Sequence, residues 1–180
     1  GGPAILAADA VAKNGLRLAA LVEKTKSKIE SLYPGVDATN PIDMIADAKG
    51  ERYSKVLGLV LADKNVDGVL VINMLKSTFF EPKDGRVIPK IASKHSGKPI
   101  VDVPAGGEDF AKVYSVLGNT SIPLYNLPEK AGKKVGIYRL TDQPVEPRVL
   151  QVFDFMGQHT GRECYDGDIF PRGVLANEIK

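Results

Sequence analysis

The stretch VDGVLVIN, residues 66–73, limits the possible folds more than any other part of this 180-residue chain. Its centre, Val69–Ile72, is a continuous apolar run, which is typical of a strand buried on both faces of a parallel sheet. A second stretch of this kind, KPIVDVP (98–104), follows it. Strands buried on both faces need helices on both sides of the sheet, so these stretches predict an α/β fold.

The remaining segments up to about residue 133 alternate between helical spacing and short apolar runs. Helices are expected at 3–14, 23–34, 49–61, 85–97, 106–118 and 127–133, and further strands at 16–21 and 122–126. Gly15 is a stop signal for the first of these helices. This alternation predicts a doubly wound, mostly parallel sheet with right-handed crossovers.

Residues 134–180 break this rhythm. KKVGIYRL is compatible with a strand and VEPRVLQVFDFMG with a short helix, whereas ECYDGDIFPRGVLANEIK is rich in turn residues and has no clear period. We therefore expect one domain over 1–133 and a C-terminal extension over 134–180.

Composition excludes several classes of protein. A net charge of +2, without a run of basic residues, does not favour a nucleic-acid partner. Cys164 is the one cysteine, so no internal disulfide is possible, and a reducing compartment fits. No stretch approaches the roughly 20 apolar residues of a membrane helix. We expect a cytoplasmic protein that binds neither nucleic acid nor membrane.

Ligands of open α/β sheets bind at the carboxyl ends of the strands, so the residues that follow each strand are the candidate site. Candidates for binding phosphate are Gly1, Gly2, Pro3 and Ala4 at the start of the first helix, with adjoining loops at Asn40, Asp43, Asn73, Gly106 and Gly107. Glycine before a helix lets backbone N–H groups approach an anion at the positive end of the helix dipole. The plainer alternative is that glycines make tight turns, Asn40-Pro41 makes another, and Asp43 caps a helix.

The histidines give weaker signals. His95 lies in a polar helix end and is expected to be solvated, and His159 has Glu163 and Cys164 nearby but no second pair of metal ligands. No metal site is predicted. The GxGxxG, GxxxxGK[ST], HExxH and GxSxG patterns are also missing, which argues against a complete nucleotide-dependent enzyme.

Four strings taken together resemble one known module. They are GGPAILAADAVAKNGLRLAAL, NPIDMIADAKGERYSKVLGLVLADKNVDGVLVI, SGKPIVDVPAGG and IPLYNLPEKA. Over residues 1–132 the chain resembles the second flavodoxin-like succinyl-CoA-ligase domain of the ADP-forming (NDP-forming) acyl-CoA synthetases. The resemblance implies a flavodoxin-like sheet. The family's strand before the glycines does not precede them here.

These synthetases interconvert acyl-CoA, ADP and phosphate with a free acid, ATP and CoA. The resemblance implies that a phosphohistidine intermediate is held between the N-termini of two helices, one of them starting at Pro3. Gly1, Gly2, Pro3 and Ala4 carry over as the turn that faces the phosphate, with Asn40 and Asp43 in the adjoining loop. CoA, ATP or ADP, and Mg would belong to the complete enzyme, and none is expected on this domain alone. The implied partners are CoA-binding and ATP-grasp domains or subunits, with oligomerisation through the flavodoxin-like domains.

Two departures from the family pattern leave alternatives open. Ala4 stands where the family usually has glycine, and HTG at 159–161 echoes the family's phosphorylated-histidine motif without its small flanking residues. The isolated chain is expected to be inactive. The alternatives are a non-catalytic scaffold or regulatory module of the same fold, as in a protein acetyltransferase, and a free-standing flavodoxin-like binder. Phe79-Phe80 is the one candidate pair for stacking a flavin, and adjacent aromatics point apart on regular elements.

Overall fold

The computed structural model describes residues 2–45, 47–74, 82–95, 97–105, 115–117, 120–131 and 149–154. Its elements are α1 (Gly2–Lys13), β1 (Arg17–Leu18), α2 (Glu23–Leu32), β2 (Ile42–Asp43), α3 (Gly50–Ala62), β3 (Gly68–Met74), the 3-10 helix η1 (Pro82–Arg86), α4 (Val87–Ala92), β4 (Ile100–Ala105) and β5 (Val149–Asp154). Short helical turns also occur at 115–117 and 128–131.

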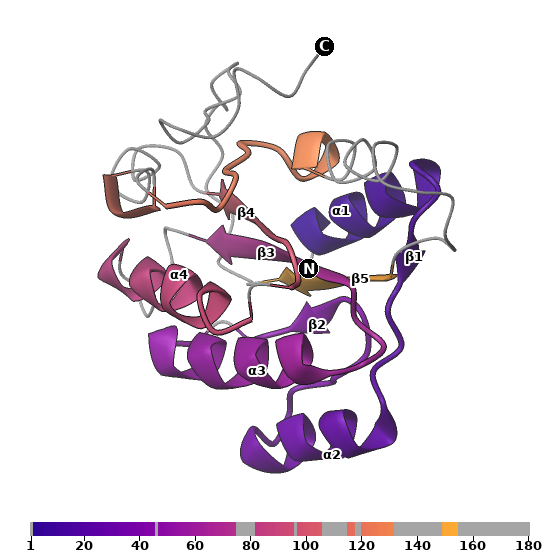
Figure 1. The fold of residues 1–180 in the computed structure, drawn as a ribbon. Coiled ribbons are helices and arrows are strands. Elements are labelled where there is room, and N and C mark those ends of the chain that lie inside the picture. The colour runs from indigo at the N-terminus through magenta and orange to yellow at the C-terminus, as the bar shows by residue number, and fades with distance from the viewer. Residues whose placement is uncertain are drawn as a thin grey trace.

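The five strands form one parallel sheet in the order β1–β5–β3–β4, with β2 also paired to β5 (Figure 1). β1 pairs with the first residues of β5 and β2 with its last ones, so these two short strands share one side of β5. A single parallel bridge from Asp102 to Leu124 adds a further position beyond β4. This arrangement confirms the predicted parallel α/β sheet.

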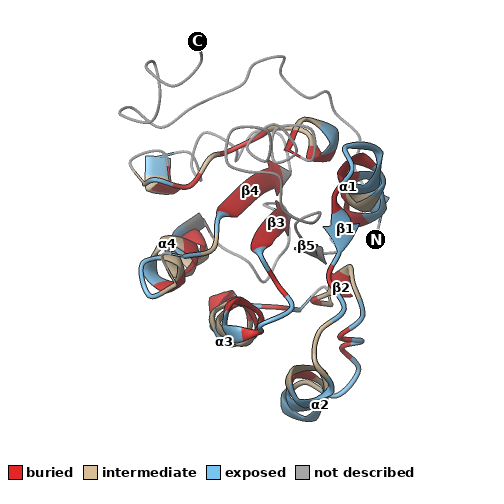
Figure 2. Cartoon of the chain, turned by 45° about the vertical axis from the view of Figure 1, so that its right-hand side comes forward, coloured by how far each residue is buried: buried red, intermediate tan, exposed pale blue. Residues whose placement is uncertain are grey.

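Helices cover both faces of the sheet (Figures 1 and 2). α1 lies on one face, where Ala4, Ala7 and Val11 share a buried cluster with Leu70, Ile72, Val101 and Val103 of β3 and β4. α3 and α4 lie on the other face, and α2 lies outside α3 (Figure 1). The fold is therefore doubly wound, as the alternation of elements predicts.

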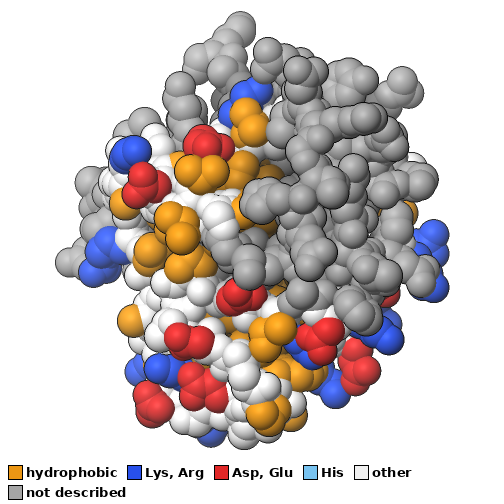
Figure 3. Space-filling view, turned by 180° about the vertical axis from the view of Figure 1, so that it is seen from behind, with side chains coloured by type: hydrophobic (Ala, Val, Ile, Leu, Met, Phe, Trp, Pro, Cys, Tyr) orange, Lys and Arg blue, Asp and Glu red, His pale blue; other side chains and the backbone are white. Residues whose placement is uncertain are grey.

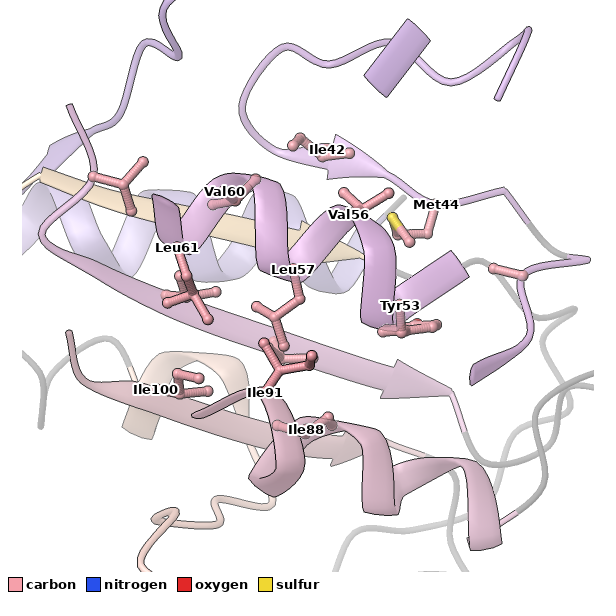
Figure 4. Packing of buried hydrophobic residues seen from close by; sticks show 14 of the residues in the cluster. Ile42, Met44, Tyr53, Val56, Leu57, Val60, Leu61, Ile88, Ile91 and Ile100 are labelled. Atoms are coloured by element: carbon pink, nitrogen blue, oxygen red, sulfur yellow. The ribbon is translucent and has the colours of Figure 1, made fainter. Parts of the chain in front are cut away.

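The larger of the two buried clusters lies under α3. In Figure 4, Val56 of α3 lies beside Met44, and Leu57 lies beside Ile91 of α4. Each of these four side chains is at most 9% exposed. Burying an aliphatic side chain of this size contributes roughly 1.5–3 kcal/mol, so the apolar spacing along α3 fixes this helix against the sheet.

α1 begins and ends close to the predicted residues. It stops at Lys13, and Gly15 has a φ of 72°, in the left-handed region that favours glycine. The Leu16 N–H then donates to the Val11 carbonyl at 3.2 Å, which satisfies one of the last carbonyls of the helix. Gly15 therefore acts as the predicted stop.

The structure differs from the sequence pattern in three places. The segment 145–157 is compatible with a short helix by its pattern, but residues 149–154 form strand β5. Its apolar residues fit the period of a helix as well as that of a strand. Pairing with neighbouring strands on two sides makes this segment a strand. The turn-rich stretch at 39–43 contains the two-residue strand β2, and the helix predicted over 85–97 is instead a 3-10 segment followed by the six-residue α4. Most of the helix predicted at 106–118 lies outside the described residues, as does the strand expected from 134.

Candidate functional site

The start of α1 is the centre of the candidate site. Gly2 is exposed, Pro3 is half-buried and Ala4 is 2% exposed, while Gly1 lies outside the described residues. The first amides of a helix have no intrahelical acceptor, and proline has no N–H, so Gly2 and Ala4 are the donors of this turn. Among the described residues, a Cβ built on Gly2 would meet nothing within 4 Å. No described side chain therefore fills the space next to Gly2.

α1 begins toward the carboxyl edge of the sheet. Its C-terminal end leads directly into β1, and its N-terminal end lies toward the side to which the arrows of β3, β4 and β5 point (Figure 1). Ligands of open α/β folds bind along this carboxyl edge. The positive end of the α1 dipole thus lies toward the carboxyl ends of the strands.

Asn40 and Asp43 serve local structure next to this edge. The Asn40–Pro41 peptide is cis, and Asn40 Nδ2 donates to the Ala19 carbonyl at 3.1 Å. Asp43, the last residue of β2, accepts a hydrogen bond from the Ile45 N–H at 2.8 Å, as in an Asx turn. Asn40 fits the plainer turn interpretation. Asp43 does not cap a helix as that interpretation predicts, because it ends β2 and holds an Asx turn, and the next helix, α3, has Lys49 as its N-cap residue.

Ile45, which follows this turn, has a φ of 61°. A branched residue in the left-handed region is strained, and such outliers concentrate at functional sites. Its side chain is half-buried and packs against the larger cluster. Sequence reasoning missed this position, because no residue type in the stretch signals a positive φ.

Asn73, near the end of β3, forms a buried polar pair with Asp102 of β4. Asn73 Nδ2 donates to both carboxylate oxygens of Asp102, at 2.6 Å and 2.8 Å, and both residues are 0% exposed. Asn73 Oδ1 is buried without a hydrogen-bond partner in the structure described. Burial raises the pKa of Asp102 to about 8, against the lowering effects of the Val103 backbone and the Asn73 amide.

Sequence reasoning selected Asn73 and missed Asp102. The available signal was an aspartate inside the apolar run IVDVP, since a charged residue is rarely buried without a partner. The partner itself could not be found from sequence, because it lies on another strand.

The other predicted residues are not brought into this site. Gly106, Gly107, His159 and Cys164 lie outside the described residues. His95 follows α4, is half-buried, and donates its backbone N–H to the Ala92 carbonyl at 2.9 Å. In the part of the chain that the structure describes, no group of three His, Cys, Asp or Glu side chains could hold a metal ion. None of the helices described there is long and apolar enough to cross a membrane.

The chain is similar to several archaeal CoA ligases. It is 37% identical over 134 residues to the alpha subunit of acetate–CoA ligase [ADP-forming] II of Pyrococcus furiosus, which covers 72% of this chain and 29% of the relative. It is 31% identical over 138 residues to acetate–CoA ligase [ADP-forming] I of Archaeoglobus fulgidus, covering 76% of this chain and 19% of the relative. The chain therefore spans less than a third of the length of these relatives.

Solved structures agree with the sequence relatives. A crystal structure of a Pyrococcus horikoshii protein matches with a TM-score of 0.71 and 32% identity over 76% of this chain and 32% of that one. The apo form of a dinucleotide-forming acetyl-coenzyme A synthetase 1 from Ca. Korarchaeum cryptofilum matches with a TM-score of 0.68 and 24% identity, covering 76% of this chain and 31% of that one, which supports the fold. No protein-family model matches the chain.

Sheet order, helix placement and these likenesses define a doubly wound, flavodoxin-like α/β domain with a helix N-terminus at its carboxyl edge. More particularly, the chain is a domain of the ADP-forming acyl-CoA synthetase family.

Proposed function

We propose that this domain serves a complete ADP-forming acyl-CoA synthetase by holding the phosphohistidine intermediate at the N-terminus of α1. The observation that carries the proposal is that α1 begins at the carboxyl edge of the sheet, with open space beside Gly2. In this role the amides of Gly2 and Ala4 donate hydrogen bonds to phosphoryl oxygens, and the helix dipole stabilises their negative charge without an added cation.

The side chains around this turn support a contact with another part of the enzyme. Ile5 is 65% exposed and Leu6 is 49% exposed, so two large apolar side chains follow the phosphate-facing amides directly. Apolar side chains reach the surface among charged ones on the back face of the molecule (Figure 3). We propose that CoA-binding and ATP-grasp domains or subunits are the partners and that they carry the CoA, ATP or ADP, and Mg of the complete enzyme.

The position of Ala4 bears on the alternative function. Alanine in place of the family's glycine was the one feature that favoured a scaffold or regulatory module. The Ala4 methyl group, however, belongs to the buried cluster between α1 and the sheet. The methyl group therefore packs against the sheet and is not in the space beside Gly2, so alanine at this position is compatible with the phosphate-binding proposal.

Titration with inorganic phosphate, followed by amide chemical shifts in NMR spectra, tests this proposal. α3 supplies a matched control because it also begins with a glycine, Gly50. There, a built Cβ would lie 2.8 Å from Asp84 Oδ1, so a carboxylate already occupies the space beside the first turn. We expect saturable shifts at Gly2 and Ala4 and none at Gly50. Equal shifts at both helix starts, or no shift at Gly2 and Ala4, would contradict the proposal.

The catalytic part of the proposal needs the complete enzyme. Gly2→Val places a branched side chain in the open space beside the first turn, and it should slow phosphoryl transfer at least tenfold because it obstructs access to the amides. Gly58→Val is a control for the loss of glycine in a helix, since a Cβ there also meets nothing within 4 Å and Gly58 lies on α3. Unchanged phosphoryl transfer in the Gly2 variant would refute the assignment of α1.

A further inference from the structure

Strand β5 lies in the interior of the sheet although it is the last described element of the chain. On one side it pairs with β3, where Gly68 is opposite Leu150 and Val71 is opposite Phe153. On its other side it pairs with β1 and β2, where Arg17 is opposite Val149 and Asp43 is opposite Asp154. β5 is therefore hydrogen-bonded along both edges.

The neighbouring strands depend on this pairing. β1 and β2 are two residues long each and, in the part of the chain described, pair only with β5. On the other side, Val69, Leu70 and Val71 of β3 are at most 1% exposed. Without β5, backbone groups of β3 would lose their partners in the middle of the domain, where buried N–H and C=O groups need them.

The position of β5 matches the first strand of the flavodoxin order. That order is 2-1-3-4-5, and strand 1 in it directly precedes the first helix. β1 and β2 together take position 2, β3 and β4 take positions 3 and 4, and Leu124 takes position 5. β5 takes position 1, but it comes from beyond residue 133 in the sequence.

We infer that the middle of the sheet is a strand-binding surface and that its partner is this chain's own segment Val149–Asp154. The segment is added to the sheet as a parallel strand. In β-strand addition of this kind, main-chain hydrogen bonds supply the binding energy. Position 1 of the flavodoxin order is then occupied by a strand that follows β3 and β4 in the sequence, and the domain over residues 1–133 requires part of the 134–180 extension to fold.

A proline substitution in the full chain tests the need for this strand. Val152 stands opposite Leu70 of β3, and proline removes a ladder N–H and disfavours a central strand. We expect Val152→Pro to lower Tm by about 10 °C or more. It should also speed hydrogen exchange at Leu18 and Asp43. Val174→Pro is the matched control, because it makes the same change in the same extension, outside the described residues.

Two outcomes of this experiment would overturn the inference. One is a Val152→Pro variant with the Tm and exchange rates of the unmodified chain. The other is an equal effect of Val152→Pro and Val174→Pro, because the strand would then have no special role.

A permuted chain tests the position of the strand without destroying it. It begins at Gly132, runs through Asp154, continues through a linker of about four residues, the usual length of a βα loop, into Gly2, and ends at Ala131. A chain of residues 1–154 in the original order is the control. If β5 holds position 1, its end can be joined to the start of α1, and the permuted chain unfolds cooperatively with protected amides in β1 and β2. Loss of cooperative unfolding in the permuted chain overturns the inference, whether or not the control folds.

Discussion

The side-chain amide of Asn73 lies within 2.8 Å of both carboxylate oxygens of Asp102, in a place where neither residue is exposed to solvent. The two residues come from adjacent parallel strands, with Asp102 opposite Val71, two residues before Asn73. One amide nitrogen facing two oxygens leaves Asn73 Oδ1 without a donor. If Asp102 is protonated, its O–H can donate to this oxygen once the amide turns, so the neutral pair satisfies both side chains.

This pair predicts that the domain loses stability as pH rises from about 4 to about 8. Burial raises the pKa of Asp102 to about 8 in the folded state, from 3.8 in its absence. Well below pH 4 both states hold the proton, and the contribution of this pair to the stability is full. Between the two values the unfolded state ionises while the folded state does not, so the free energy of unfolding falls by about 1.4 kcal/mol per pH unit. Above pH 8 the loss is complete and the profile levels out.

Urea unfolding at several pH values measures this slope. Asp102→Asn keeps the shape, forms an amide–amide pair with Asn73, and should flatten the profile between pH 4 and 8. Asp37→Asn is the control, because hydrogen bonds from Thr39 lower the pKa of the exposed Asp37 and its ionisation affects only the acid range. A wild-type profile that is flat between pH 5 and 8 would show that Asp102 is ionised in the folded protein.

Removing the Asn73 amide should extend the pH dependence of stability, whereas Asp102→Asn should remove it. Asn73→Ala takes away the side-chain hydrogen bond that lowers the pKa of Asp102, so this pKa should rise further and the loss of stability should extend to higher pH. The variant should also be less stable at neutral pH by about 1–3 kcal/mol, because a buried carboxyl group loses its partner. Urea unfolding between pH 7 and 10 checks both effects, and a midpoint that moves down in pH would contradict the pairing.

The sequence predicted the parts of this structure that local pattern decides. The apolar runs before Asn73 and around Asp102 are buried strands, and Gly15 ends α1 where expected. What local pattern cannot decide is which distant segments meet. VLQVFD fits a helix as well as a strand until β1 and β3 offer it ladder hydrogen bonds on two sides. Likewise, Asp102 looks like an isolated charge until β3 places Asn73 beside it.

Asp63 supplies another link that the sequence does not reveal. This aspartate ends α3, is 2% exposed, and accepts hydrogen bonds from the backbone N–H of Val22 at 3.0 Å and of Asn65 at 2.9 Å. Val22 is the N-cap residue of α2, so one side chain ties the start of α2 to the end of α3. Asp63→Ala should destabilise the domain by about 2–4 kcal/mol. Hydrogen bonds to a charged group are worth roughly 1.5–3 kcal/mol, and the substitution leaves two backbone N–H groups without their acceptor.

Thermal unfolding and hydrogen exchange measure this effect. Exchange should speed up most in the first turn of α2. Asp37→Ala, which removes an exposed aspartate that also accepts a backbone hydrogen bond two residues ahead, is the control and should change stability by less than about 1 kcal/mol. Equal effects of the two substitutions would mean that Asp63 acts only through its local turn.

Replacing glycine by alanine in α3 should change the stability of the domain in opposite directions at Gly50 and at Gly58. A Cβ on Gly50 would lie 2.8 Å from Asp84 Oδ1 and 3.0 Å from Asp84 Cβ, so alanine there must displace η1 or the Asp84 side chain. A Cβ on Gly58 would meet nothing within 4 Å. Alanine favours a helix over glycine by roughly 0.8–1 kcal/mol, so Gly58→Ala should stabilise the domain by about that amount. Gly50→Ala should instead destabilise it by about 1–3 kcal/mol, as overpacking does. Chemical unfolding of both variants checks the sign, and stabilisation by Gly50→Ala would mean that Asp84 does not pack against the start of α3.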